Sequence, residues 1–192
     1  MDSIIEKLVE RQKLLFEEGF SDEKLVPIEY EEKLWSIEKK IDDVVSMNAS
    51  RRKKIIKIQT LMSEFREVSA SDVACKNGCS NCCHMQVILQ QTEADAIGFM
   101  IGRKPVQLDI NFKIKDPLKS YGRDTPCTFL VNGGCSIYEN RPFMCRYYVN
   151  LDRDNLLCSF ENLDLAKEHD PRAVSIPMAE ANQLFSAFKL IN

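Results

Sequence analysis

Apolar residues recur at helical intervals through the first third of the chain. Ile4 and Leu8 begin this pattern, which predicts a helix that ends near Gly19, a residue type that suits a helix stop. Ser3 and Glu6 have the spacing of a capping box, in which each side chain accepts a hydrogen bond from the backbone N–H of the other residue. We therefore expect an amphipathic helix that starts at Ser3.

Two more amphipathic helices are predicted before residue 70. Pro27 suits the first turn of the second helix. Its apolar residues step by four, three, four and three positions, which is the spacing of a heptad seam: Tyr30, Leu34, Ile37, Ile41 and Val44. The third helix, over about 51–68, has an apolar face: Ile55, Ile58, Met62 and Phe65. We expect a helical hairpin or small bundle, with the seam as core or dimer contact rather than as a ligand groove.

Shorter elements are predicted beyond residue 90. Thr92, with Asp95 three residues on, has the features of an N-cap, and the helix that follows is expected to end at Gly102. The stretch 103–125 contains several proline and glycine residues and predicts a loop, with one strand over 108–114.

A turn signal stands at Asn132 and Gly133. These residue types adopt the positive φ angles of a tight turn, so a hairpin is expected over 128–138. Pro142 predicts the start of another helix, and a closing helix is expected from about Pro177. The fold class predicted from all these elements is mainly α with a small β-hairpin.

The length of the chain, 192 residues, allows one domain with an appendage or two small domains. We divide it at the point where the cysteines begin. Residues 1–70 are expected to form an N-terminal helical hairpin or bundle, which could contact an unidentified protein partner. Residues 71–192 are expected to form a metal-centred cysteine-cluster domain with a C-terminal helix.

The charge of the chain excludes some classes of partner. A net charge of −3 and a pI of about 5.6 give no general attraction for nucleic acid. The basic run over 51–54 has acidic residues before it in the chain, which favours a solvated helix face. No secretory signal begins the sequence, and no run approaches about eighteen apolar residues. We expect a cytoplasmic protein that does not enter the membrane.

The cysteines change this picture most. Four of them, with one histidine, fall within residues 75–84, and no cysteine precedes them. Thiolates bind soft and borderline metals, and disulfides are rare in a reducing cytosol, so we interpret the set as metal ligands. The candidate metal ligands are Cys75, Cys79, Cys82, Cys83, Cys127, Cys135, Cys145 and Cys158.

The first cysteine group predicts its own local geometry. Cys75, Cys79 and Cys82 lie on one short loop, and Gly78 permits the turn that directs backbone N–H groups at sulfur. The neighbouring side chains of Cys82 and Cys83 diverge, so one tetrahedral ion does not accommodate both.

The distal cysteines are expected to complete one or two sites. In a hairpin, Cys127 and Cys135 would lie roughly 13 Å apart along the strands unless the chain bends at Pro126. The predicted principal site is Cys75, Cys79, Cys82 and Cys145. The predicted second site or structural reserve is Cys83, Cys127, Cys135 and Cys158.

The spacing favours an iron–sulfur cluster, such as [4Fe–4S], over zinc. Structural zinc usually draws on two Cys-x2–4-Cys pairs, whereas three close thiols completed by a remote cysteine are typical of iron–sulfur clusters. His84 and His169 are alternative ligands, although a lone histidine is more often a surface or core residue. The spacing is also that of radical S-adenosylmethionine enzymes, but Asn81 replaces their usual aromatic residue, and too little βαβ chain follows.

A longer pattern joins the cysteines of both groups. It reads Cys75-x3-Cys79-x2-Cys82-Cys83, then Pro126-Cys127-Thr128-Phe129-Leu130, then Cys135-Ser136-Ile137-Tyr138-Glu139-x-Arg141-Pro142-x2-Cys145-Arg146-x-Tyr148. This pattern, over roughly 72–150, resembles the YkgJ-type cysteine-cluster family, which is described as a zinc- or iron-chelating domain. The resemblance implies a cysteine-ligated metal. A similar cluster in the flagellin lysine methylase implies an iron–sulfur centre paired with S-adenosylmethionine.

Arg141 and Arg146 belong to this pattern and flank Cys145. Their guanidinium groups could neutralise thiolate charge or bind an anionic substrate. The alternative that we favour is structural, with each arginine paired to Glu139 or another carboxylate.

The function predicted from the sequence is metal binding through clustered cysteines, with an iron–sulfur cluster or zinc. One alternative is a lysine methyltransferase-like enzyme that uses S-adenosylmethionine, although the chain lacks a G-x-G nucleotide loop. Another is an interaction protein in which the metal only stabilises the fold. Whether the protein is an enzyme stays open.

Overall fold

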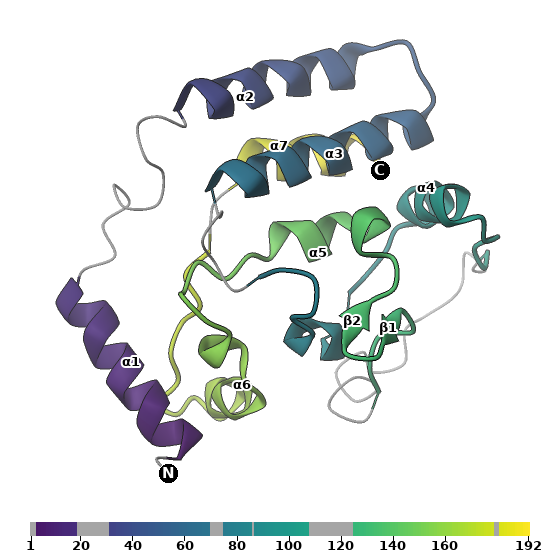
Figure 1. The fold of residues 1–192 in the computed structure, drawn as a ribbon. Coiled ribbons are helices and arrows are strands. Elements are labelled where there is room, and N and C mark those ends of the chain that lie inside the picture. The colour runs from purple at the N-terminus through teal and green to yellow at the C-terminus, as the bar shows by residue number, and fades with distance from the viewer. Residues whose placement is uncertain (1–2, 19–30, 70–74, 86, 108–124, 179–180) are drawn as a thin grey trace.

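The computed structural model describes most of the chain. The described residues are 3–18, 31–69, 75–85, 87–107, 125–178 and 181–192. They form seven α-helices, three short 3-10 helices and one two-stranded hairpin (Figure 1). The predicted class, mainly α with a small β-hairpin and N-terminal helices, is confirmed. The features predicted at Gly19, Pro27, Tyr30 and 108–114 lie outside the described residues.

The first helix, α1 (Ile4–Glu18), begins as its sequence predicts. The backbone N–H of Ser3 donates to Glu6 Oε2 at 2.6 Å, and the backbone N–H of Glu6 donates to Ser3 Oγ at 3.2 Å. These reciprocal bonds satisfy two N–H groups that a helix start otherwise leaves unpaired, so the capping box is confirmed.

Helices α2 (Glu31–Ser46) and α3 (Arg51–Ser69) form a hairpin, and α7 (Asn182–Ile191) lies beside α3 (Figure 1). The heptad seam supplies three buried residues to the core between these helices: Ile37, Ile41 and Val44. The apolar face of α3 meets them with Ile55, Ile58 and Met62, all buried. The seam is therefore core within the chain, as burial of an amphipathic face predicts.

Two short helices complete this core. Helix α4 (Gln91–Ile101) contributes Ala96, and α5 (Phe143–Tyr147) contributes Phe143, which stacks on Phe188 of α7 with ring centroids 4.3 Å apart. The core thus draws on both sides of residue 70, where we divided the chain. That division stays a prediction.

A buried carboxylate, Glu93, connects α3, α4 and α5. Its Oε1 atom accepts a 2.6 Å bond from the backbone N–H of Phe143 and a 3.0 Å bond from Gln59 Nε2. Because α5 has only five residues, this bond to its first N–H group fixes where the helix begins. Cys145 lies on that helix, so Glu93 positions a predicted metal ligand.

The predicted ends of two helices need correction. Helix α4 begins at Gln91, so Thr92 lies in its first turn and is not the N-cap, although the helix does end at Gly102 with φ 66°. The closing helix begins at Asn182 rather than near Pro177, because the backbone at Met178 forms an isolated β-bridge with Asn150 instead.

The hairpin consists of β1 (Leu130–Val131) and β2 (Gly134–Cys135), which pair antiparallel. Its turn residues have positive φ angles, 50° at Asn132 and 77° at Gly133, as the sequence predicts. The strands are shorter than expected. The chain turns at residues 128–129, so Cys127 does not continue the extended strand.

A second, smaller core lies at the other end of the molecule, where α1 packs against α6 (Phe160–Lys167) and the 3-10 helix Leu156–Cys158 (Figure 1). Its buried residues are Leu8, Leu157, Leu165 and Val174. Asn162 lies beside it, with its side chain hydrogen-bonded to the backbone of Leu157 and Val174. No helix of the described residues has both the length and the apolar character needed to cross a membrane.

Candidate metal centre

The loop from Cys75 turns as its sequence predicts. Gly78 has φ 99°, a conformation that side chains disfavour, and the backbone N–H of Cys79 donates to Lys76 O at 3.0 Å. The 3-10 helix Asn81–His84 then carries Cys82 and Cys83. The side chains of these two cysteines are hydrogen-bonded to each other, so the expected divergence of their thiols does not keep them apart.

Two backbone-directed hydrogen bonds connect the distal cysteines to this region. The backbone N–H of Cys127 donates to Cys83 O at 2.7 Å, and Asn81 Nδ2 donates to Cys158 O at 3.0 Å. The 3-10 helix that ends at Cys158 also receives a bond at its start, from the backbone N–H of Leu156 to Asp154 Oδ1 at 2.9 Å. All eight cysteines are free thiols.

The thiols surround one cavity of about 460 Å³. Seven of the eight cysteines line it: Cys75, Cys79, Cys82, Cys83, Cys127, Cys135 and Cys145. Its wall is otherwise largely apolar, with Met85, Val87 and Leu89 on one side, and Arg66, Tyr138 and Arg141 add polar groups. Neither His84 nor His169 lines the cavity.

Electrostatic interactions divide the thiols into two sets. In what we call the Cys75 set, Cys158 interacts with Cys75 and Cys79. In what we call the Cys83 set, Cys145 interacts with Cys127, Cys83 and Cys135. Cys82 interacts with members of both sets and lies between them, and Cys83 also interacts with Cys79 of the Cys75 set.

This division differs from the predicted partition. We expected Cys145 to complete the site of Cys75 and Cys79, and Cys158 to join the second site. In the structure α5 carries Cys145 toward Cys83, although Cys145 also interacts with Cys82, whereas Asn81 holds Cys158 near the first loop. Cys127 and Cys135 both interact with Cys83, and their separation of roughly 13 Å stays a prediction.

The protein raises the pKa of five of these thiols. Burial is the largest cause for each, and repulsion between neighbouring thiolates adds to it. The pKa rises to about 12 for Cys82 and Cys145 and to about 11 for Cys158. Cys82 has a large solvent-accessible surface because it lines the cavity. Its sulfur is nevertheless poorly hydrated, because the cavity walls surround it. These groups are therefore thiols, not thiolates, at neutral pH.

Asn150 connects two thiols of the Cys75 set, a role that the sequence analysis missed. Its backbone N–H donates to Cys75 Sγ at 3.3 Å, and its side-chain Nδ2 lies 3.5 Å from Cys158 Sγ. Such N–H groups stabilise thiolate and orient it toward a metal. No spacing in the sequence marks Asn150 for this role.

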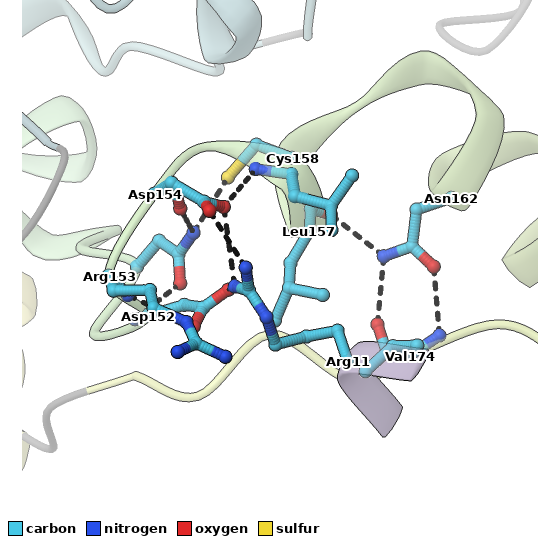
Figure 2. A network of polar contacts seen from close by, with 10 residues as sticks. Arg11, Asp152, Arg153, Asp154, Leu157, Cys158, Asn162 and Val174 are labelled. Atoms are coloured by element: carbon cyan, nitrogen blue, oxygen red, sulfur yellow. Dashed lines mark hydrogen bonds and ion pairs between the residues drawn. The ribbon is translucent and has the colours of Figure 1, made fainter. Parts of the chain in front are cut away.

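Helix α1 reaches the same loop through Arg11 (Figure 2). Its guanidinium group forms ion pairs with Asp152 and with Asp154, the second at 2.7 Å. Asp152 in turn donates its backbone N–H to Asn150 Oδ1 at 2.9 Å. The N-terminal helix thus supports the residue that contacts both Cys75 and Cys158.

The two arginines of the cysteine pattern are buried and bind backbone carbonyls. Arg146 donates to Arg141 O at 3.0 Å and also to Glu139 O and Ser63 Oγ. Arg141 donates to Tyr138 O at 2.6 Å. Among the described residues, neither pairs with a carboxylate, so the expected ion pair with Glu139 is wrong. Burial lowers the pKa of both, to about 10 for Arg146.

Comparison with known proteins gives one match. Residues 74–168 match the model of a family whose description is "CxxCxxCC: Putative zinc- or iron-chelating domain". This stretch of the chain is similar to that family. The match confirms the resemblance expected from the cysteine pattern and supports metal binding through cysteines. It does not separate zinc from iron and says nothing of a methyltransferase. No curated protein and no solved structure matches the chain.

The cavity has a donor set that fits a thiophilic metal, because sulfur predominates over oxygen around it. The set is open. Among the residues that the structure describes, no three side chains of the types His, Cys, Asp or Glu are close enough to enclose a single ion. Binding of one ion therefore requires the thiols to approach one another, whereas a larger inorganic cluster needs less movement.

Proposed function

We propose that this protein holds two metal centres, each bound by four cysteine thiolates, and that both are iron–sulfur clusters. The observation that carries the proposal is that the free thiols form two interacting sets, and that all of them except Cys158 line one cavity. Four thiolates are the usual ligand complement of a [4Fe–4S] cluster.

The assignment of Cys82 follows from counting. The Cys83 set already has four members: Cys83, Cys127, Cys135 and Cys145. The Cys75 set has three, namely Cys75, Cys79 and Cys158, and Cys82 interacts with the first two of these. We therefore assign Cys82 to the Cys75 set on ligand number alone, because its interactions with Cys83 and Cys145 are the larger ones.

The open spacing of the thiols favours iron–sulfur over zinc. Four sulfurs around one zinc ion, at Zn–S distances of about 2.3 Å, lie within about 4 Å of one another. The described thiols do not converge to that degree. A cluster that places iron and sulfide between the ligands spans a wider set, and the cavity of about 460 Å³ supplies the room.

A bound iron–sulfur cluster supplies one-electron redox chemistry. Two features of this chain would change the reduction potential of such a cluster. The Asn150 N–H groups donate toward two sulfurs, and the nearby Arg66 and Arg141 place positive charge by Cys75. Both effects stabilise the more negative, reduced state and raise the reduction potential.

The test is metal analysis of protein purified without oxygen. We expect stoichiometric iron and sulfide, and visible absorbance near about 400 nm, the region of iron–sulfur charge transfer. Colourless protein with stoichiometric zinc would overturn the iron–sulfur assignment alone. Protein that binds neither metal would overturn the whole proposal.

Two serine variants test the partition. In Cys145→Ser and in Cys158→Ser, we expect each protein to keep about half of its metal, because each change opens one set and leaves the other intact. The double variant Cys75→Ser with Cys158→Ser separates the two partitions: it should keep about half of the metal if both cysteines bind the same centre, and lose all of it if the partition predicted from sequence holds. His169→Gln is the control, since His169 does not line the cavity.

A further inference from the structure

We propose that Arg66 and Arg141, held by Tyr138, form a binding site for an organic carboxylate with an apolar body, on the wall of the cysteine cavity. The inference rests on the proposed function in one respect: the carboxylate would lie beside the metal centre. Its evidence is separate and comes from an arginine pair that has no ion-pair partner among the described residues.

Tyr138 holds both guanidinium groups. Arg66 Nη1 donates to the Tyr138 hydroxyl at 2.8 Å. The guanidinium carbon of Arg141 lies 3.8 Å from the centroid of the Tyr138 ring, and Arg141 Nη1 donates to Tyr138 O at 2.6 Å. One aromatic residue thus fixes two cations at the cavity wall, where cation–π stacking favours the planar guanidinium group.

In the part of the chain that the structure describes, no carboxylate forms an ion pair with these two arginines, although Glu139 interacts with Arg141 electrostatically. Arg141 is nevertheless only 6% exposed. The contrast within the same chain is Arg11, which is similarly buried but contacts Asp152 and Asp154. Buried charges are normally paired, and the two arginines also repel each other. The pair therefore favours an anion that the described residues do not supply.

Metal-bound thiolates could supply part of that negative charge, because both arginines act on Cys75. They do not account for the apolar wall of the cavity. Met85 and Leu89 line it and are 50% and 38% exposed, and Val87 lies between them in sequence. A ligand that has an apolar body would cover these side chains while its carboxylate met the guanidinium donors, which match two coplanar oxygens.

The test measures anion binding to the metal-loaded protein by calorimetry, with acetate, hexanoate and inorganic phosphate as probes. We expect hexanoate to bind more tightly than acetate, and at least about tenfold more weakly to Arg66→Gln and Arg141→Gln, because each change removes a charge-assisted hydrogen bond. Arg66→Gln matters most, since Arg66 is less buried than Arg141 and its replacement is less disruptive. The control is Arg172→Gln, whose exposed arginine pairs with Asp170 away from the cavity wall.

The outcomes separate this proposal from the metal proposal. Binding of phosphate but not of hexanoate would overturn the carboxylate assignment. If no probe binds, while the arginine variants change the metal content or the reduction potential, the arginines only balance the charge of the centre, and the site is refuted. If the protein holds no metal yet binds hexanoate through Arg66, the carboxylate site stands and the metal centre fails.

Discussion

The backbone N–H of Asn150 donates to Cys75 Sγ over 3.3 Å, between residues that are 75 positions apart in the chain. The side-chain amide of the same residue lies 3.5 Å from Cys158 Sγ. One asparagine therefore connects a cysteine of the first loop to the last cysteine of the sequence. Its own orientation depends on the loop that Arg11 of α1 holds.

Replacement of Asn150 should weaken metal binding in one set only. In Asn150→Ala the side-chain donor to Cys158 is lost, and removal of such outer-shell partners typically costs about 10- to 100-fold in metal affinity. We expect faster metal loss to a chelator from the Cys75 set, with the Cys83 set unchanged. Asn155→Ala is the matched control, because its side chain is exposed and makes no capping bond. Equal metal loss in both variants would contradict the role of Asn150.

Metal binding should release protons. The pKa values of about 12 for Cys82 and Cys145 mean that both are protonated at neutral pH, and a metal must displace those protons. Apparent affinity is therefore expected to rise as pH increases from about 6 to about 8. Calorimetry in buffers of different ionisation enthalpy counts the protons released. A binding enthalpy that does not depend on the buffer would refute this prediction.

Loss of Arg11 should destabilise the protein in a pH-dependent way. Arg11→Gln leaves Asp152 buried without its cation, which costs about 3 kcal/mol at neutral pH. Arg11 also lowers the pKa of Asp154. The stability that comes from a lowered carboxyl pKa is present above about 3.9, the pKa of the unfolded chain, and is lost as pH falls through the folded pKa.

Urea unfolding at neutral pH and below pH about 4 measures both effects. The difference in unfolding free energy between wild type and Arg11→Gln should shrink at the lower pH. Lys13→Gln, which changes an exposed residue of the same helix, serves as the control. A difference that stays constant with pH would exclude the contribution of Asp154.

Glu93 supplies a test of how α5 is positioned. In Glu93→Ala, the Phe143 N–H and the Gln59 amide lose their common acceptor inside the core, which should cost about 3 kcal/mol of unfolding free energy. Glu93→Gln keeps an acceptor oxygen of the same shape and should cost less. Thermal or urea unfolding of both variants measures the difference between their unfolding free energies. We also expect Glu93→Ala to release metal from the Cys83 set, because Cys145 lies on α5.

The pKa of Glu93 gives this comparison a second readout. Burial raises that pKa, so the wild type loses stability as pH rises from about 4.3, the pKa in the unfolded chain, through the higher folded value. Glu93→Gln has no such titration. If the unfolding free energies of the wild type and of Glu93→Gln fall in parallel over this pH range, Glu93 is not the group whose titration causes the loss of stability.

Local patterns were sufficient to predict much of the fold. The capping bonds of Ser3, the turn at Asn132 and the bend at Gly78 each depend on a few neighbouring residues, and the structure has all three. The hydrophobic seam of α2 was also predictable from sequence, because the apolar residues of a buried helix face repeat with the helical period. The cysteines themselves indicated metal binding, since sulfur chemistry does not depend on the fold.

The pairing of distant residues was decided only in three dimensions. The packing of α5 brings Cys145 near Cys127, Cys83 and Cys135, and the loop near Asn150 brings Cys158 near Cys75, and no spacing along the chain encodes that packing. Glu93 and Asn150 carry no motif, yet each holds a segment that bears a thiol. Sequence periodicity reports which face of an element is buried, but which elements meet depends on how their buried faces fit together.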